Sequence, residues 1–394
     1  MREGWEIKKL DEVCIFQRGL TYTKSDEVEF SENCVLRSNN IDLDSMSIVL
    51  DDLKYVRKDL IIDEDKIVKP NTILICMSNG SKQHIGKVAF VDRKYGYAFG
   101  GFMGLIIPQS IFPKYVYYSC LSPSYKHFLK GIGNGANITN LKFSDLSNYT
   151  IPVPPLSEQE RIVAELDLLN EVIAKKREQL TQLDALAQSL FYTMFGDPVT
   201  NEKGWETKRL GDVCQTSAGG TPTKGRSEYY DNGTIPWLRS GEINKMYICN
   251  TELFINELGL RNSSAKWFPK NTVVIAMYGA TVGQVGILCH EMTTNQAVCG
   301  IFPNKTFAPI YLYHFLHSQK ENYIKIAAGG AQPNISQNIV RNTLICCPPL
   351  ALQQRFASKI EAIEQQKERI RQSLAEVQQL FDSRMDYYFN EWAE

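Results

Sequence analysis

Several features of enzymes and membrane proteins are missing from the 394-residue sequence. It has no apolar run of about 18 residues, so we expect no membrane-spanning helix. The N-terminal MREGWEIKKLDEV has no apolar stretch behind its charges, so we expect no secretory signal. The ten cysteines form no C-x-x-C pair, and their spacing suits neither a zinc site nor a disulfide framework. These absences predict a cytoplasmic protein with reduced, mostly buried cysteines.

Catalytic signatures are missing as well. The segment 80–87 resembles a P-loop, but it has one residue too many between its glycines and Val88 replaces the hydroxyl residue. The run FGGFMG at 99–104 is not the G-x-G-x-x-G of a dinucleotide fold, and H-E-x-x-H and G-x-S-x-G are absent. Of the five histidines, His314 and His317 lie three apart among aromatic residues, where we expect them to pack. The sequence therefore predicts no catalytic residue, no metal ligand and no cofactor of its own.

The formal net charge is −1, which does not favour a free-standing DNA-binding protein. Such proteins gain much of their affinity by neutralising phosphates with an excess of Lys and Arg. Either the chain does not bind DNA, or it shares the phosphate contacts with a more basic partner. Charge alone leaves both possibilities open.

The sequence contains an internal duplication. Matching segments occur in the same order, with shifts of 194 to 202 residues: GWEIKKLDEVC at 4–14 with GWETKRLGDVC at 204–214, LRSNNI at 36–41 with LRSGEI at 238–243, NTILICM at 71–77 with NTVVIAM at 271–277, and VPPLSEQERI at 153–162 with CPPLALQQRF at 347–356. A period this long indicates two whole domains of one type, not a solenoid.

Each copy changes character at a Pro-Pro pair. Before it, short apolar runs bounded by turn residues are typical of buried strands, with short helical stretches around 113–130 and 309–326. After it, apolar residues recur at steps of three and four over about five heptads, which indicates a coiled-coil helix about 58 Å long. The predicted boundaries are 1–155 and 197–349 for the domains, and 156–196 and 350–394 for the helices.

The apolar seam of each helix needs a partner, and the other copy supplies one. Parallel and antiparallel pairing are both possible, and we expect the antiparallel pair. The predicted fold class is α+β: two mixed α/β domains, separated and linked by two long antiparallel coiled-coil helices in a pseudo-twofold internal repeat. The predicted seam residues are Ile162, Leu166, Leu169, Ile173, Leu180, Leu183 and Leu190, and Phe356, Ile360, Ile363, Ile370, Leu374 and Val377.

Several segments resemble the specificity subunits of type I restriction-modification systems, the HsdS family. They are PPLSEQERIVAEL at 154–166, LFYTMFGDP at 190–198, GGTPTKGRSEYYDNGTIPWLRSGEI at 219–243, SSAKWFPKNTVVIAMYGATVGQVGI at 263–287 and TNQAV at 294–298. The resemblance covers essentially the whole chain, as recognition domain, helix, recognition domain, helix. The first domain departs from the pattern at 16–30 and 77–86, which suggests that the two domains read unlike half-sites.

The resemblance implies a non-catalytic cytoplasmic subunit of a bacterial or archaeal complex, which recognises a bipartite, asymmetric target in double-stranded DNA. The implied partners are two methyltransferase subunits and, optionally, two restriction (motor-nuclease) subunits. Adenine-N6 methylation and ATP-dependent cleavage belong to those partners, which bind S-adenosylmethionine, ATP and Mg. The alternative is a coiled-coil scaffold that binds protein partners without reading DNA.

Residues that read base edges should be Arg, Asn, Gln, Ser or Thr on loops held by a rigid scaffold. The DNA-binding candidates of the first domain are Arg18, Thr21, Tyr22, Lys24, Arg37, Asn39, Ser78, Asn79, Lys82, Gln83 and Asn137. Those of the second are Thr221, Thr223, Lys224, Arg239, Ser240, Tyr278, Thr281, Gln284, Gln332 and Asn334. Arg37 and Arg239 are repeat-equivalent, which favours a phosphate contact or a stabilising role. Asn79, Lys82 and Gln83 differ from their counterparts, which favours a role in specificity.

Overall fold

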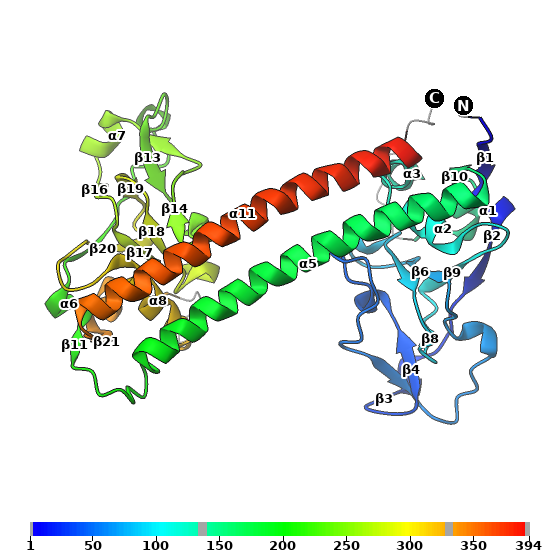
Figure 1. Ribbon diagram of the computed structural model, residues 1–394, viewed down its shortest axis with the longest axis horizontal. Coiled ribbons are helices and arrows are strands. Elements are labelled where there is room, and N and C mark those ends of the chain that lie inside the picture. The colour runs from blue at the N-terminus through cyan, green and yellow to red at the C-terminus, as the bar shows by residue number, and fades with distance from the viewer. Residues whose placement is uncertain (1–2, 133–139, 328–333, 391–394) are drawn as a thin grey trace. The chain divides into compact units, whose positions relative to one another are not determined.

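The computed structural model describes residues 3–132, 140–327 and 334–390. The chain divides into two compact units, 1–177 with 372–394 (unit 1) and 178–371 (unit 2). Each contains one predicted domain and one part of both long helices (Figure 1). No helix of the described ranges is long and apolar enough to cross a membrane.

Unit 1 is built on a four-stranded antiparallel sheet with the order β2-β9-β6-β7, beside a second sheet β3-β5-β4-β8 and the pair β1-β10. Its elements are β1 (Glu6–Lys9), α1 (Leu10–Val13), β2 (Cys14–Arg18), β3 (Glu27–Val28), β4 (Asn33–Leu36), β5 (Lys54–Val56), β6 (Thr72–Cys76), β7 (Val88–Val91), β8 (Ala98–Phe99), β9 (Met103–Pro108), α2 (Pro113–Ser119), α3 (Pro123–Ile132), α4 (Phe143–Leu146) and β10 (Thr150–Val153).

Unit 2 repeats this plan, with sheets β12-β20-β17-β18-β14 and β15-β13-β19-β16 and the pair β11-β21. Its elements are β11 (Thr207–Arg209), α6 (Leu210–Val213), β12 (Thr216–Ala218), β13 (Ile235–Leu238), β14 (Tyr247–Ile248), β15 (Phe254–Ile255), α7 (Glu257–Arg261), β16 (Trp267–Phe268), β17 (Val273–Ala276), β18 (Val285–Leu288), β19 (Met292–Thr294), β20 (Val298–Ile301), α8 (Pro309–Ser318), α9 (Lys320–Ala327), α10 (Gln337–Asn342) and β21 (Leu344–Cys346).

The two long helices are α5 (Leu156–Phe195) and α11 (Leu350–Phe389). A buried glutamine one turn into each helix anchors it to its own domain. The Gln159 side chain accepts a hydrogen bond from Phe112 N (2.8 Å) and donates to the Pro154 carbonyl (2.8 Å). Gln353 does the same with Ala308 N (2.9 Å) and Pro348 O (2.9 Å). Because both ends of each buried amide are satisfied, the Pro-Pro junction holds the helix start in place.

The helices run antiparallel within each unit, which confirms that prediction. In unit 1, Arg161 donates to the Tyr388 hydroxyl (3.3 Å), and Glu165, one turn further along α5, pairs with Arg384, one turn earlier on α11 (2.8 Å). In unit 2, Lys367 pairs with Asp184 (2.6 Å), and the Phe195 ring packs on Phe356, earlier on α11.

The predicted seam residues differ in how deeply they are buried. Ile162, Leu166, Ile173, Phe356, Ile360 and Ile363 are buried, whereas Leu169, Leu180, Leu183, Leu190, Ile370, Leu374 and Val377 are half-buried. The buried residues at the start of each helix also face the core of their own domain. The half-buried ones from 169 to 183 and from 370 to 377 belong to neither domain core except for Leu183, so fewer apolar neighbours cover them.

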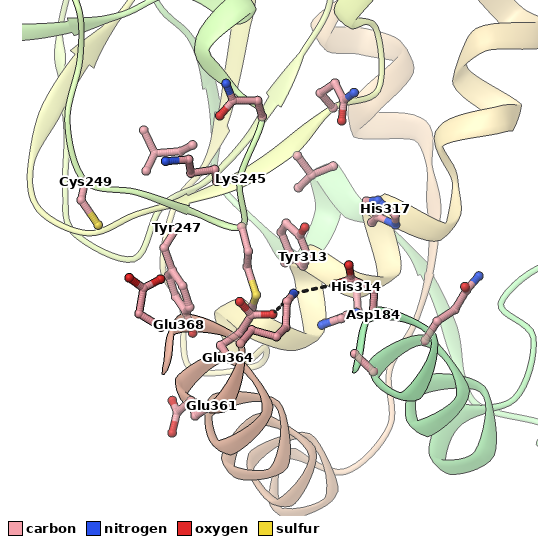
Figure 2. A pocket seen from close by; sticks show the side chains of 18 of the residues that line it. Asp184, Lys245, Tyr247, Cys249, Tyr313, His314, His317, Glu361, Glu364 and Glu368 are labelled. Atoms are coloured by element: carbon pink, nitrogen blue, oxygen red, sulfur yellow. Dashed lines mark hydrogen bonds and ion pairs between the residues drawn. The ribbon is translucent and has the colours of Figure 1, made fainter. Parts of the chain in front are cut away.

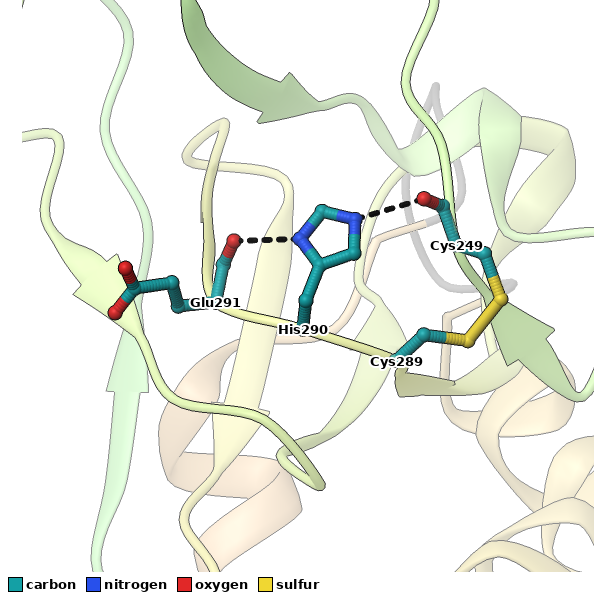
Figure 3. The surroundings of a disulfide bond; sticks show 4 residues. All are labelled: Cys249, Cys289, His290 and Glu291. Atoms are coloured by element: carbon teal, nitrogen blue, oxygen red, sulfur yellow. Dashed lines mark hydrogen bonds between the residues drawn. A yellow bond between two sulfur atoms is a disulfide. The ribbon is translucent and has the colours of Figure 1, made fainter.

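One prediction about the cysteines is wrong. Cys249 and Cys289 form a disulfide, although nothing in their 40-residue separation indicates it (Figure 3). They follow β14 and β18, which are neighbouring parallel strands with Ile248 opposite Leu288, so the next residue on each strand lies within bonding range. The Cα atoms are 4.9 Å apart, within the range that a disulfide needs. The other cysteines are free, and most are buried, as predicted.

Candidate nucleic-acid interface

The loops at one end of the unit 1 sheets surround a cavity of about 520 Å³. The segment after β2, the turn after β4, the loop after β6 and the turn between β8 and β9 all contribute to its wall. Eight of the residues predicted to bind DNA line it: Arg18, Thr21, Tyr22, Lys24, Arg37, Asn39, Ser78 and Asn79. Residues up to 61 positions apart in the sequence therefore form one surface of donors and acceptors.

A glycine allows this surface to form. A Cβ atom added at Gly19 would lie 2.1 Å from the Gly100 carbonyl oxygen and 2.5 Å from that of Phe99. The next residue, Leu20, donates its N–H to the Phe99 carbonyl (2.7 Å). Gly219 has the same role in unit 2, where an added Cβ would lie 2.3 Å from the Thr294 carbonyl oxygen. Only glycine permits this approach of two backbones, which places the following loop against the β8–β9 turn.

The cations around the unit 1 cavity fall into two kinds. Arg37 pairs with Asp52 (3.1 Å), which also accepts a hydrogen bond from Asn39 (3.0 Å). The hydrogen bond from Asn39 and the charge of Arg37 lower the pKa of Asp52. Arg18 and Lys24, by contrast, have no ion pair or side-chain hydrogen bond to another described residue. Their charges are uncompensated beside the cavity, where an anion gains most from them.

The counterpart of Arg37 in unit 2 is also neutralised. Arg239 pairs with Glu242 (3.1 Å) and with Glu252. Arg37 thus links the turn after β4 to Asp52, and Arg239 links the turn after β13 to Glu252, which agrees with a stabilising role. The Nε of Arg37 is buried without a hydrogen-bond partner among the described residues.

The remaining unit 1 candidates follow β6 or precede α4 in the chain, and the structure describes some of them. Asn79 donates to the Ser38 hydroxyl (2.7 Å), and Ser78 forms a β-bridge with Asn140. Gln83 is exposed but does not line the cavity. Lys82 lies in the short helical turn after Ser81, but its side chain lies outside what the structure describes, as does the whole of Asn137.

Most DNA-binding candidates of unit 2 lie in or beside its turns, whereas Gln284 lines a separate cleft. Thr221 donates to the Gln296 side chain, and Tyr278 forms the β-bridge with Asn334 that corresponds to Ser78 with Asn140. Thr281 donates to the Tyr278 carbonyl (3.1 Å). Thr223 and Lys224 are exposed, and Ser240 begins the turn after Arg239. Gln284 instead lines a different cleft, and Gln332 lies outside the described residues.

Two exposed residues at the equivalent turn were not predicted. Phe102 lines the unit 1 cavity, and Gln296 is exposed next to Thr221. They belong to the runs FGGFMG and TNQAV, and nothing in either run marks these two residues as exposed. Their placement depends on the β8–β9 and β19–β20 turns, which a sequence pattern alone does not orient.

The other cleft, of about 1430 Å³, lies wholly in unit 2 between α8, α11, the end of α5 and the segment 241–252 (Figure 2). Carboxylates and cations are mixed on its wall, and most are paired: Lys367 with Asp184 (2.6 Å) and Glu364 (2.5 Å), and Glu368 with Arg371 (3.4 Å). Because most charges of this cleft are already paired, it attracts an anion such as DNA much less strongly than the unit 1 cavity does.

His314 packs in this cleft between aromatic rings, as expected, with Phe356 at 5.1 Å and Phe191 at 6.1 Å between ring centroids. Its Nε2 is buried and has no hydrogen-bond partner among the described residues. Burial, with the nearby charges of His317 and Lys367, lowers the pKa of His314 from 6.5 to about 3.

This burial predicts a pH-dependent stability. Between pH 6.5 and about 3 the unfolded chain takes up a proton on His314 that the folded chain excludes, so stability falls as the pH falls through this window. We expect His314→Phe to remove about 2 kcal/mol of the loss between pH 7 and pH 5, as measured by urea unfolding at both pH values. The exposed His127→Phe is the control and should retain the wild-type loss. The same pH dependence in His314→Phe and wild type would contradict the prediction.

Comparison with known proteins identifies the family of the chain. The model of the type I restriction modification DNA specificity domain matches the chain twice, at residues 2–184 and 202–379. The chain belongs to this family. The two matches correspond to the internal duplication, and each contains one globular domain with most of the long helix that follows it. Within the described residues, no group of three or more His, Cys, Asp or Glu side chains could hold a metal ion.

Several members of this specificity family are similar to the chain. The type I restriction enzyme EcoKI specificity subunit of Escherichia coli K12 is 24% identical over 92% of this chain and 82% of its own length. The MjaIX specificity subunit of Methanocaldococcus jannaschii is 26% identical over 67% of this chain, and the match spans 65% of that relative. Among solved structures, the S subunit from Mycoplasma genitalium has a TM-score of 0.61 at 14% identity, covering 98% of this chain and 96% of that one. These matches establish the HsdS-like fold.

Proposed function

We propose that this chain is the DNA specificity subunit of a type I restriction-modification complex. The observation that carries the proposal is the unit 1 cavity, where two uncompensated cations, Arg18 and Lys24, lie among amide and hydroxyl groups. In this proposal residues 1–155 and 197–349 are recognition domains, and each reads one half of a bipartite, asymmetric target. The different side chains at equivalent turns support unlike half-sites.

The chain itself is non-catalytic in this proposal. Two methyltransferase subunits and, optionally, two restriction subunits assemble with it in the cytoplasm, and they bind S-adenosylmethionine, ATP and Mg. The formal net charge of −1 agrees with such sharing, because basic partners would supply many of the phosphate contacts.

The decisive experiment is methylation mapping. The chain is co-expressed with a type I methyltransferase subunit from its own genome, in a host that lacks both, and the host DNA is sequenced by a method that detects N6-methyladenine. We expect one bipartite motif that disappears when this chain is omitted. Methylation that does not depend on the chain, or selective binding to protein partners without any selective binding to DNA, would favour the scaffold alternative.

The long helices set the spacer between half-sites in this proposal. Removing 172–178 from α5 together with 372–378 from α11 shortens both helices by one heptad and retains the pairs Glu165–Arg384 and Asp184–Lys367. A heptad spans about 10.5 Å, so we expect the methylated motif to lose about three base pairs from its spacer.

A matched insertion of seven residues at the same two places is the control for this deletion. It should lengthen the spacer by a similar amount and leave both half-site sequences unchanged. An unchanged spacer in either variant would contradict the role of the helices as a ruler.

A further inference from the structure

An aromatic ring is exposed in the middle of the unit 1 surface. Phe102 lies in the turn between β8 and β9 with 72% of its surface exposed. The turn that carries it is held in place: the Phe102 carbonyl accepts hydrogen bonds from Met77 N (2.9 Å) and Ser78 N (3.1 Å), and Met103 N donates to Gly100 O (2.8 Å). A fixed backbone thus presents to solvent a large apolar side chain, which the hydrophobic effect would otherwise bury.

The neighbours of Phe102 are polar groups suited to nucleic acid. Phe102 lines both the 520 Å³ cavity and an adjoining one of about 560 Å³. Arg18, Ser78 and Asn79 line both cavities as well. The ring therefore lies beside the uncompensated Arg18 and the hydrogen-bonding groups that we propose to contact DNA, while Met77, Leu141 and Phe143 also line the adjoining cavity.

The second copy differs at this position in the side chain and not in the backbone. Cys76 pairs with Met103 in unit 1 as Ala276 pairs with Val298 in unit 2, so Phe102 corresponds to Ala297. The hydrogen bond of Met77 N to the Phe102 carbonyl has its equivalent in Met277 N to the Ala297 carbonyl (2.7 Å). Ala297 is buried, and the exposed residue there is its polar neighbour Gln296. The two domains thus present different chemistry from the same turn.

The base edges in the major groove contain one apolar group, the C5-methyl of thymine, and phenylalanine is among the side chains that contact it. We propose that Phe102 is a specificity-determining residue that recognises a thymine methyl group in the half-site read by the first domain. This inference rests on the proposed function and adds a residue and a base to it.

The test combines a base analogue with a protein variant. The full chain in complex with its methyltransferase partner is titrated with its target duplex, in which each thymine of the first half-site is replaced in turn by deoxyuridine, which lacks only the methyl group. We expect wild type to lose roughly three- to fivefold in affinity at one position. Phe102→Ala should show that loss already on the thymine duplex, and no further loss on the deoxyuridine duplex.

Ile61→Ala is the matched control, because Ile61 is 86% exposed in the same unit and lines neither cavity. It should bind both duplexes as wild type does. An equal loss from deoxyuridine in wild type and Phe102→Ala, or no loss in wild type at any thymine, would overturn the inference while leaving the proposed function intact. If wild type bound a duplex of scrambled sequence as tightly as the target duplex, the proposed function itself would fail.

Discussion

Replacing both Arg18 and Lys24 with alanine should weaken binding of the target duplex by roughly 100-fold at about 0.1 M salt. Both side chains line the unit 1 cavity without an ion pair to another described residue, so their charges are available to DNA. Each lost phosphate contact should also reduce the slope of log K against log salt concentration by about one. The measurement is fluorescence anisotropy of the complex with its methyltransferase partner at several salt concentrations.

Two paired cations of the same unit provide the control for this variant. Lys58 and Lys69 lie beside Glu32 (3.2 Å) and Glu64 (3.9 Å) and line neither unit 1 cavity. Their double alanine variant should bind almost as wild type does. If it weakened binding as strongly as the Arg18 and Lys24 variant, the effect would be one of net charge, and the cavity would have no special role.

The single variants should also distinguish two kinds of contact. A cation that binds phosphate changes affinity uniformly across sequences, whereas an arginine that binds guanine relaxes specificity at one position. We expect Lys24→Ala to act in the first way. Arg18 lies at the end of β2, where the strand restricts its backbone, and we expect Arg18→Ala to act in the second way.

Phe356→Ala should lower the free energy of unfolding of unit 2 by about 3–5 kcal/mol. Phe356 is fully buried where α11 and the end of α5 meet α8, with the rings of Phe195 at 5.2 Å and Phe191 at 5.8 Å. Truncation leaves a cavity that rigid helices cannot collapse around. Urea unfolding followed by tryptophan fluorescence measures the change, since Trp205, Trp237 and Trp267 all belong to unit 2.

Leu186→Ala is the matched control for this prediction, because Leu186 lies on α5 in the same unit with 47% of its surface exposed. We expect a change of less than about 1 kcal/mol. A loss below about 1 kcal/mol for Phe356→Ala would mean that the end of α5 does not contribute to the unit 2 core, in conflict with the ring contacts observed there.

Much of the helical architecture could be predicted from the sequence, because its causes are local. The Pro-Pro pairs and Gly196 bracket a run without Gly or Pro, and α5 ends at Phe195, one residue from the predicted boundary. Gly196 adopts a left-handed conformation (φ +77°), which terminates the helix. The short helical stretches expected around 113–130 and 309–326 are present as two helices each, and the first helix of each pair ends at Ser119 or Ser318.

The sequence predicted which residue types on loops could form the binding surface. It predicted less well which of these residues lie together in the fold. Eight candidates line one cavity because the strands that precede them end at the same side of two neighbouring sheets. Gln284 was expected to act with Thr221 but lies in the other cleft, because its loop turns toward α8. The repeat alignment predicted the equivalence of Arg37 and Arg239, but not that each has an acidic partner.

The sequence by itself determined the features that depend on neighbours along the chain: the duplication, the strand runs, the Pro-Pro junctions and the two long helices with their apolar seams. The tertiary structure alone decided which distant groups meet. Neighbouring parallel strands place Cys249 beside Cys289. Two close backbones at Gly19 place the β2 loop against the turn of Phe102, where hydrogen bonds between distant strands hold the backbone and leave the ring exposed. Such contacts depend on packing in three dimensions, which periodicity and spacing do not specify.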